Sequence, residues 1–410
     1  MGQVTRPAEG FRLRDIAVAA YGPSVVISTG HGAVLPVLAL RARDLGADVG
    51  TAALVVGLLG VGMLITSLPA GVVIARIGEK RALQVAGVVD AVAMGAAALT
   101  DSVVGLGAAV VLSGMAWTTF LISRQGFMID AVPPPFRARA LSVLGGTYRI
   151  GVFVGPLVGA ALIHVWGLPA VFWFALVLSL AAGGLATVMP DLGSENRAEQ
   201  RAEGHPSLWS VLVAHRRILL TLGIAVVVIG ASRSVRNGLL PLWAESIGIS
   251  ASTTSLIFAL AALVDIAFFY PGGWVMDRYG RTVVAVPVVL SVAIAALLLP
   301  LTSGPVGVAA VMMLIAAGNG LGSGIVMTLG ADTAPTRGRS QYLGAWRLCG
   351  DVGNSGGPLL VSAVASVAPL ATACLVIGVL GLLGTGWVGY WTRLVERRRT
   401  SALSDDGVSR

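Results

Sequence analysis

The stretch Pro69-Ala-Gly-Val-Val-Ile-Ala-Arg-Ile-Gly78 returns later in the chain as Pro271-Gly-Gly-Trp-Val-Met-Asp-Arg-Tyr-Gly280. The two copies lie 202 positions apart. The same offset relates two further features, namely the aspartates Asp130 and Asp332 and the glycine–proline pairs Gly155-Pro156 and Gly357-Pro358. A repeat that keeps one offset over this distance indicates a chain built from two copies of one half.

The composition predicts a membrane protein. Hydrophobic residues make up 56% of the 410 residues and charged residues 12%, whereas soluble domains are about 25% charged. The mean hydropathy of +0.85 reflects more apolar surface than a soluble core absorbs. The 54 glycines agree with this interpretation, because small residues let membrane helices approach closely. Cys349 and Cys374 both lie in apolar stretches and do not suggest a disulfide framework.

Twelve stretches are long and apolar enough for membrane helices, which need about 20 largely apolar residues. The predicted fold class is an all-α membrane protein with twelve transmembrane helices, six in each half. The predicted spans are residues 16–40, 50–74, 82–99, 103–128, 140–164, 168–189, 218–244, 252–276, 282–301, 306–329, 340–366 and 369–391. The predicted domains are an N-terminal six-helix bundle over residues 1–190, a cytoplasmic linker over 191–215, a C-terminal six-helix bundle over 216–392 and a cytoplasmic tail over 393–410.

The distribution of basic residues predicts the orientation in the bilayer. Most of the 28 lysines and arginines fall on one side if the N-terminus is cytoplasmic, and the outer loops hold only Arg41 and Arg43. This positive-inside pattern predicts a multi-pass protein of the inner or plasma membrane with both termini in the cytoplasm. Residues 1–15 are polar, and the first apolar stretch is too long for a cleavable signal peptide, so we expect it to stay as the first helix.

The second copy of the repeat lies in the short loop between the eighth and ninth predicted spans. It resembles the signature loop of the major facilitator superfamily, a motif of glycine, aspartate and arginine formed here by Gly273, Asp277, Arg278, Gly280 and Arg281. The resemblance extends over essentially the whole chain. It implies two six-helix bundles, related by a pseudo-twofold axis along the membrane normal, with a solute site between them.

The first copy lies in the matching loop between the second and third spans and keeps the motif residues Gly71, Arg76 and Gly78. It departs from the superfamily motif at Ala75, which replaces the aspartate, and at Glu79, which replaces an arginine. In the superfamily the aspartate bonds to a helix end of the other half and latches one conformation. The resemblance assigns that role to Asp277, so the latch is predicted to be asymmetric.

The two repeat aspartates stand near the starts of the fifth and eleventh spans. Asp130 and Asp332 are the partners that the resemblance implies for the loop arginines Arg76 and Arg278. Proline before a helix and arginine at the cytoplasmic rim suit a helix that starts at the membrane surface. The alternative is that the loop residues only fix the topology.

The fifth span contains Gly151-Val-Phe-Val-Gly155-Pro156-Leu-Val-Gly159. It resembles the glycine–proline signature of the drug:proton antiporter branch of the superfamily, although the upstream glycine of that signature falls on Ser142. Arg124-Gln125-Gly126 in the fourth span resembles the arginine motif of that branch only weakly, because arginine and glutamine are adjacent here. The structural alternative for the glycine–proline tract is close helix packing with a proline kink.

Charged residues also lie inside the predicted spans, where each costs about 2.5–3.5 kcal/mol on insertion scales and usually faces an internal cavity. Arg233 and Arg236 have no acidic residue in their own span. They therefore need a partner from elsewhere, for which Asp265, Asp90 or an anionic substrate is available.

An aromatic residue next to an arginine occurs in both halves, as Tyr148-Arg149 and Trp346-Arg347. Such a pair suits the binding of a planar or anionic organic solute. The predicted substrate-binding residues are His31, Tyr148, Arg149, Arg233, Arg236, Asn319, Trp346, Arg347 and Asn354. The structural alternatives are aromatic packing and hydrogen bonds between helices, and for His31 a hydrogen-bonded packing role.

Three carboxylates inside the spans are candidates for proton coupling. Asp90 and Asp265 are surrounded by apolar residues, and a carboxylate of this kind can load and release protons as a cavity opens to each side. Asp351 is the third candidate, but Arg347 is spaced i,i+4 from it, so the two share a helix face and are expected to pair. That pairing is also the structural alternative for both residues.

These features predict secondary transport of a small organic solute by alternating access. The leading interpretation is proton-coupled efflux of drugs or metabolites, because of the fifth-span signature. The alternative is proton-coupled uptake of an organic anion, favoured by the surplus of buried arginine, and a third is a membrane sensor without transport. An enzyme is not expected, because the four histidines are spread over positions 31, 164, 205 and 215 and no HExxH or GxxxxGK[ST] motif occurs.

The predicted partners follow from the same interpretation. They are a small organic solute, the proton as coupling ion, and the lipid bilayer, with the tail cluster Arg397-Arg398-Arg399 at anionic headgroups. We expect a monomer without cofactor or metal. The formal net charge of +8 reports topology, so nucleic acid is not an expected partner.

Overall fold

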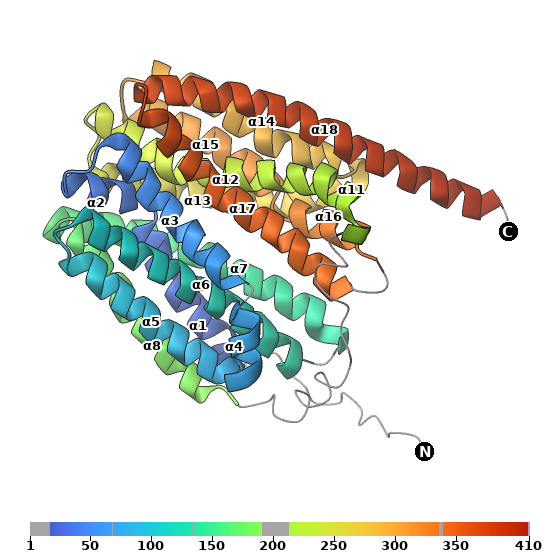
Figure 1. Cartoon of the computed structure of the whole chain (residues 1–410), viewed down its shortest axis with the longest axis horizontal. Coiled ribbons are helices and arrows are strands. Elements are labelled where there is room, and N and C mark those ends of the chain that lie inside the picture. Colours follow the sequence, from blue (N-terminus) through green and yellow to red (C-terminus); the bar gives the residue numbers. More distant parts are fainter. Residues whose placement is uncertain (1–16, 68, 133, 191–212, 336–338, 409–410) are drawn as a thin grey trace.

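The computed structural model describes residues 17–67, 69–132, 134–190, 213–335 and 339–408. The regular structure throughout these ranges is helical, and no strand occurs in them (Figure 1). Most of the predicted linker, over residues 191–212, lies outside the described residues. The helices before it are α1 (Ala17–Val34), α2 (Leu38–Asp44), α3 (Val49–Ser67), α4 (Pro69–Ile77), α5 (Glu79–Leu99), α6 (Val103–Ala131), α7 (Pro134–Trp166) and α8 (Pro169–Leu185).

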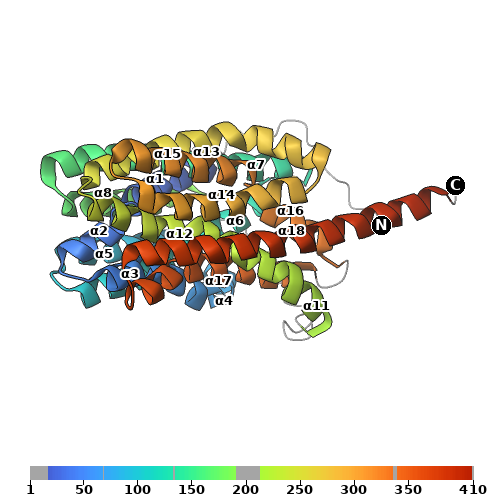
Figure 2. The same ribbon diagram turned by 90° about the horizontal axis from the view of Figure 1, so that it is seen from above.

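The helices after the linker begin with one short turn and end with a long helix. They are α11 (Arg216–Ile218), α12 (Ile224–Ser246), α13 (Ala251–Tyr279), α14 (Thr282–Leu298), α15 (Pro305–Leu321), α16 (Ile325–Thr333), α17 (Arg339–Ala365) and α18 (Leu370–Val408). The last predicted span, over residues 369–391, is shorter than the helix that contains it, because α18 continues to Val408. Figure 2 shows α18 running along the bundle and past its end.

Ten of the described helices are long and apolar enough to cross a membrane, and an eleventh span results when α1 and α2 count as one bent by 43°. The remaining span of the predicted twelve, over residues 340–366, corresponds to α17, which has 27 residues. At 1.5 Å per residue α17 is about 40 Å long, but Arg347, Asp351 and Asn354 make it more polar than the other spans. It packs against α3 of the first half and α12 of the second, so it lies at the contact between the halves.

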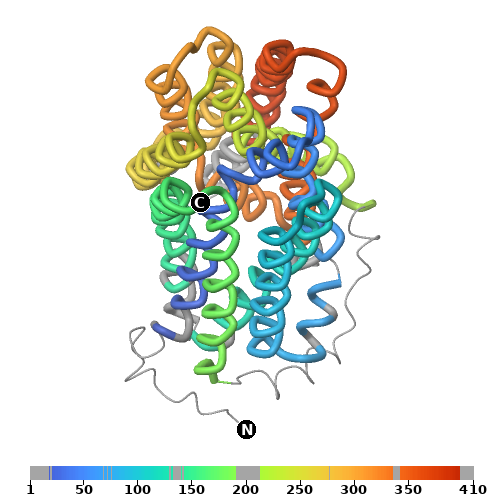
Figure 3. Tube along the Cα trace, turned by 90° about the vertical axis from the view of Figure 1, so that its left-hand side faces the viewer, coloured from blue at the N-terminus to red at the C-terminus, as the bar shows by residue number. Residues whose placement is uncertain are grey.

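The helices gather in two bundles, α1–α8 and α11–α18 (Figure 3). In the first bundle α1 packs against α7 and α8, and in the second α12 packs against α17 and α18. The bundles meet where α7 packs on α13 and where α17 packs on α3. The 202-residue offset carries α7 onto α17 and α3 onto α13, so the two contacts are counterparts of each other.

The backbone repeats with the same offset. Glycines with positive φ end helices at equivalent places, Gly46 (87°) with Gly248 (79°) and Gly78 (89°) with Gly280 (98°). The N-terminus of α3 is capped by the Asp48 carboxylate, which accepts a hydrogen bond from the Thr51 backbone N–H at 2.8 Å. Ser250, 202 residues later in the chain, caps α13 through the Thr253 backbone N–H at 3.2 Å.

The two ends of the molecule differ in what they contain. At one end, the tail end, α18 continues past the bundle and the α4–α5 and α13–α14 turns lie (Figures 1 and 2). At the other, the opposite end, α2 and the α2–α3 and α12–α13 turns lie (Figure 1). The predicted outer-loop residue Arg41 lies within α2 and is buried, with its guanidinium bonded to Asp44 at 2.9 Å and to the Thr100 carbonyl at 3.0 Å.

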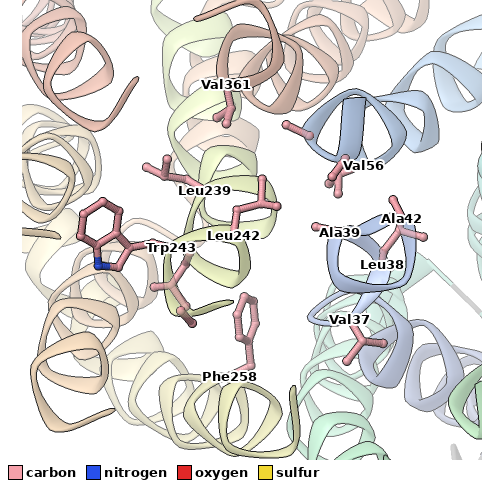
Figure 4. Close-up of a cluster of buried hydrophobic side chains, with 14 of the residues drawn as sticks. Val37, Leu38, Ala39, Ala42, Val56, Leu239, Leu242, Trp243, Phe258 and Val361 are labelled. Atoms are coloured by element: carbon pink, nitrogen blue, oxygen red, sulfur yellow. The ribbon is translucent and has the colours of Figure 1, made fainter. Parts of the chain in front are cut away.

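A hydrophobic cluster joins the bundles near the opposite end (Figure 4). Val37 and Leu38 of the first bundle and Leu239, Leu242 and Phe258 of the second are all buried in it. Lipid tails are as apolar as these side chains, so the contact is stabilised by close packing rather than by transfer from water. It fixes the two bundles against each other at this end.

Candidate functional site

An ion pair joins the two bundles in their interior. Arg149 of α7 contacts Asp265 of α13 at 2.8 Å between Nη1 and Oδ2, and it also donates to the Ser323 hydroxyl. The other Asp265 oxygen accepts a hydrogen bond from the Asn319 amide at 2.9 Å. The Arg149 guanidinium lies 4.2 Å from the centre of the Phe269 ring. Both charged side chains are largely buried, so this pair holds a charged contact across the interface between the halves.

Two arginines of α12 lie beside this pair. Arg233 donates to the Gly322 carbonyl at 2.6 Å, while the Nε atoms of Arg233 and Arg236 are buried without a hydrogen-bond partner. The charges of Asp265, Arg236 and Arg149 all act on Arg233. Two carboxylates were expected as partners of these arginines. Asp265 lies near them, whereas Asp90 is hydrogen-bonded inside the first bundle.

Tyr148 and Arg124 extend the cluster into the first bundle. Tyr148 is 37% exposed, and the charges of Arg236, Asp265, Arg124 and Arg149 act on its hydroxyl. Arg124 of α6 also has a buried nitrogen, Nη1, without a partner, and it is repelled by the charge of Arg347. The weak arginine motif at Arg124 was the only sequence signal for this residue.

The predicted i,i+4 pair of α17 is present but loose. Arg347 Nε lies 4.0 Å from Asp351 Oδ2, and the Arg347 side chain is 40% exposed. Asp351 also accepts a hydrogen bond from the hydroxyl of Ser67 in α3 at 3.2 Å, which is a second polar contact between the halves. Asn354 is exposed three residues further on, so it continues the face of α17 that carries Arg347 and Asp351.

Trp346 does not join the cluster that Tyr148 joins. It is 3% exposed, donates to the Val326 carbonyl at 2.8 Å, and stacks on Tyr342 with ring centres 6.0 Å apart. The offset of the repeat explains the difference, because it carries Arg149 onto Asp351 and not onto Arg347. The aromatic–arginine pairs of the two halves are therefore not equivalent positions.

A second polar cluster lies inside the first bundle. Asp90 of α5 is fully buried and accepts hydrogen bonds from Ser113 at 2.6 Å and Ser179 at 2.5 Å. His31 Nε2 lies 3.1 Å from the same carboxylate. The His31 ring stacks on Trp117 with centres 4.2 Å apart. The two serines are donors that the sequence did not point to, since an isolated serine in an apolar span is common packing material.

The ring of Trp117 connects this cluster to the central one. Its centre lies 6.1 Å from that of Tyr148, which is within the range of favourable aromatic contact. The predicted residues His31 and Asp90 thus form one group, and Tyr148, Arg149, Arg233, Arg236 and Asp265 form another. A row of aromatic rings links the two groups.

The motif turn of the second half is held by acidic side chains. Arg281 Nε binds Asp332 at 2.9 Å, whereas Arg278 is exposed and lies over the rings of Trp274 and Tyr279 at 5.4 and 5.7 Å. Asp332 therefore contacts Arg281, and its expected pairing with Arg278 stays a prediction. The side chains of Asp130 and Asp277 lie outside the described residues, so the latch contacts expected of them stay predictions.

Glu396 of α18 is a further part of this turn. Its carboxylate accepts hydrogen bonds from the Arg281 backbone N–H, from the Thr282 N–H at 3.3 Å and from the Thr282 hydroxyl at 2.6 Å. It therefore caps the N-terminus of α14 from another helix. A Cβ at Gly280 would collide with this carboxylate. Gly71 and Gly273, by contrast, have open space where a Cβ would stand, and Arg76 is exposed.

A third contact between the halves lies at the opposite end. Arg43 Nε is 3.1 Å from the Glu245 carboxylate. These residues are 202 positions apart, so they are the same position of the repeat. Equivalent positions touch each other only on a twofold axis, so this pair marks where the pseudo-twofold axis leaves the molecule. Opposite charges there turn a contact that would otherwise repel into an ion pair.

A family model described as the Major Facilitator Superfamily matches residues 24–358 and, in a second match, residues 222–406. The chain belongs to the Major Facilitator Superfamily. It is accordingly a multi-span membrane transporter of small solutes and not an enzyme. Within the described residues, no group of three histidine, cysteine, aspartate or glutamate side chains is placed to hold a metal ion.

Two curated relatives of similar length are, by name, a multidrug resistance protein and an export protein. The multidrug resistance protein MdtH of Klebsiella pneumoniae (strain 342) is 25% identical over 390 residues, which cover 93% of this chain and 94% of that protein. The staphylopine export protein of Staphylococcus aureus (strain Mu50 / ATCC 700699) is 24% identical over 366 residues, which cover 83% of this chain and 87% of that protein.

Solved structures share the fold at low identity. A POT family transporter in complex with 5-aminolevulinic acid aligns with a TM-score of 0.78 at 11% identity, over 95% of this chain and 98% of that chain. A D-xylose-proton symporter aligns with a TM-score of 0.71 at 14% identity, over 93% and 98% of the two chains. Similarity at this level extends to the fold and leaves the solute open.

Proposed function

We propose that this transporter exports a small organic solute in exchange for protons, as a monomer in the inner or plasma membrane. The halves, residues 1–190 and 216–392, rock against each other so that a central site opens to each side in turn. The positive-inside pattern of the sequence supports a cytoplasmic tail end. The names of the relatives MdtH and the staphylopine exporter support the outward direction.

The observation that carries the proposal is the Arg149–Asp265 ion pair between the halves. An ion pair in an interior of low dielectric holds its two helices together. When the Asp265 carboxylate takes up a proton from the outer side, an O–H bond forms and the charge on the carboxyl group disappears. Arg149 then loses its counter-ion, and α7 and α13 are free to separate. Release of that proton to the cytoplasm restores the pair.

The other predicted carboxylates have different parts in this proposal. Asp90 lies within one half, where His31, Ser113 and Ser179 all bond to it, so it is the second candidate for proton coupling. Asp351 bonds to Ser67 of the other half, so it supports the contact between α17 and α3. On this proposal Tyr148 and the arginines face the solute.

Proton-coupled uptake of an organic anion is the second candidate function. The central cluster contains more arginines than carboxylates, which favours an anion. An anion entering a cell moves against an inside-negative potential that costs about 2.3 kcal/mol per charge for each 100 mV. Inward transport of an anion therefore needs cotransported protons, and the same Asp265 would supply the coupling.

The test is transport in proteoliposomes with an imposed pH gradient and a panel of solutes. We expect Asp265→Asn to abolish pH-driven accumulation and to keep solute exchange without a gradient, because the amide binds no proton. Asp90→Asn tests the second carboxylate. Asp101→Asn, an exposed residue between α5 and α6, is the matched control. Unchanged pH-driven flux in both Asp265→Asn and Asp90→Asn would contradict proton coupling through these residues.

The direction of the same flux separates the two candidate functions. Efflux coupled to inward proton movement supports export, and solute uptake in the direction of the proton gradient supports symport. Solute movement that ignores the pH gradient in the parent protein would contradict both.

A further inference from the structure

The central cluster has more positive than negative partners. Within the described residues, Arg149 pairs with Asp265 and Arg347 with Asp351, whereas Arg124, Arg233 and Arg236 form no ion pair. These three come from both halves, Arg124 from α6 and the other two from α12. The repulsion between Arg124 and Arg347 and between Arg233 and Arg236 adds to the excess charge.

Each of the three arginines also has a buried nitrogen that bonds to nothing. These atoms are Nη1 of Arg124 and Nε of Arg233 and Arg236. A buried donor without a partner costs about 1–3 kcal/mol, and more when it is charged. An uncompensated charge inside a membrane protein is rare and marks a substrate or ion pathway. Three such donors in one region therefore point to a group that neutralises them during the transport cycle.

The chemistry of the three side chains defines that group. A guanidinium binds carboxylate or phosphate through paired N–H donors. Tyr148, whose hydroxyl lies among the charges of Arg124 and Arg236, adds a neutral donor and a ring face. Arg149 and Arg347 are not available in the same way, because each already has its carboxylate.

We propose that Arg124, Arg233, Arg236 and Tyr148 bind a solute with two negative charges, carried either by two carboxylates or by a phosphate. This inference rests on the proposed transport function and names the substrate class of the same site. Because Arg124 belongs to one half and Arg233 and Arg236 to the other, a bound dianion contacts both halves. It replaces repulsion across the interface by attraction, so binding brings the halves together around the solute.

The test is ligand binding by the purified full chain in nanodiscs without a pH gradient, followed by thermal stabilisation. The panel contains isophthalate as a dicarboxylate, phenyl phosphate as a phosphate monoester, benzoate as a monoanion, isophthalamide as a neutral analogue and benzamidine as a cation. We expect the doubly anionic compounds to bind about tenfold or more tightly than benzoate, with isophthalamide and benzamidine weaker still. Comparison of isophthalate with phenyl phosphate tells whether carboxylate or phosphate is preferred.

Arg124→Gln, Arg233→Gln and Arg236→Gln are each expected to weaken dianion binding about tenfold or more and to leave isophthalamide binding unchanged. The matched control is Arg393→Gln, an exposed arginine of α18, which should change neither. The unliganded cluster variants should unfold at the same temperature as the parent or higher, because each substitution removes repulsion. This second measurement separates a lost binding contact from a folding defect.

Several outcomes overturn the inference. Neutral or cationic analogues that bind as tightly as the dianions do would exclude an anion site, as would dianion binding that survives all three substitutions. Failure of the proposed transport function gives a different result. Dianion binding without pH-driven flux would support the anion site and contradict proton coupling. Conversely, pH-driven flux of a neutral solute that the three substitutions leave unchanged would support the transport function and contradict the anion site.

Discussion

The two halves share a backbone and differ where they touch each other. Arg149 of α7 and Asp351 of α17 are the same position of the repeat, and each reaches across to the other half. Arg149 lies over the ring of Phe269, and Asp351 accepts a hydrogen bond from Ser67. Phe269 and Ser67 are also the same position of the repeat. The geometry of the contact has been kept in both halves while its charge has been reversed.

The same contrast appears at two other places. Arg43 and Glu245 carry opposite charges at one repeat position and bind each other. His31 and Arg233 are also equivalent, yet His31 lies against Asp90 inside one bundle and Arg233 donates to the Gly322 carbonyl. Turns and caps, by contrast, recur with little change. Duplication therefore accounts for the scaffold, and the broken symmetry accounts for the charged contacts on which transport depends.

The largest expected effect comes from removing, one at a time, the charges at the two equivalent positions Arg149 and Asp351. Arg149→Gln leaves the buried Asp265 without its ion-pair partner, which typically costs 3–5 kcal/mol of unfolding free energy. We expect the lower end, about 3 kcal/mol, because the charge of Arg233 still acts on Asp265. Asp351→Asn should cost at most about 1 kcal/mol, since its arginine is 4.0 Å away and the amide still accepts from Ser67.

The measurement for this comparison is the unfolding free energy of the purified protein, with Asp101→Asn as an exposed control. Equal losses for Arg149→Gln and Asp351→Asn would mean that the two contacts are energetically alike, against the difference in their geometry. A double variant, Arg149→Gln with Asp265→Asn, should recover part of the loss because it leaves no unpaired charge.

Some of this site was predictable because its signals are local. The i,i+4 spacing of Arg347 and Asp351 predicts a pair on one helix face, and the structure contains it. The repeat of Gly78 as Gly280 predicts matching turns, and both glycines have positive φ. In each case the residues that decide the outcome lie within one turn or one helix.

The contacts between helices were not predictable from the same sequence. Helices such as α3 are apolar on every side, so no polar face tells which side meets protein and which meets lipid. The partner of Asp90 is therefore not visible in sequence, although His31, Ser113 and Ser179 all bond to it. The packing of Trp346 on Tyr342 was not visible for the same reason, since its place beside an arginine says nothing about the rotation of α17.

The second prediction tests the axis pair at the opposite end. Arg43→Glu or Glu245→Arg places like charges together, and the charge-swapped double variant restores the attraction. The two side chains are 32% and 35% exposed, so we expect a change of about 1 kcal/mol, or roughly a fivefold shift in population. Each single variant should favour states in which the opposite end is open.

Labelling of a buried cysteine measures this shift. Leu242→Cys, at a position 1% exposed in the cluster of Figure 4, is introduced in a background with Cys349→Ala and Cys374→Ala. We expect each single charge variant to label about fivefold faster than the parent and the double variant to return to the parental rate. If the single and double variants label alike, the pair does not hold this end closed.

The smallest expected effect concerns the two equivalent helix caps, where the halves use different chemistry for one task. Asp48→Ala and Ser250→Ala should each cost about 0.5 kcal/mol at neutral pH, the low end for a helix cap, because both residues are exposed. Hydrogen bonds from the Thr51 backbone N–H and hydroxyl lower the pKa of Asp48 below its ordinary value. Its contribution is therefore complete above the ordinary aspartate pKa of about 3.9 and is lost as the pH falls through the lowered value.

The unfolding free energy lost in Asp48→Ala should then shrink on acidification, whereas that lost in Ser250→Ala should not, because a hydroxyl does not titrate in this range. A Ser250→Ala loss that shrinks equally would assign the pH response to the rest of the protein and not to the cap.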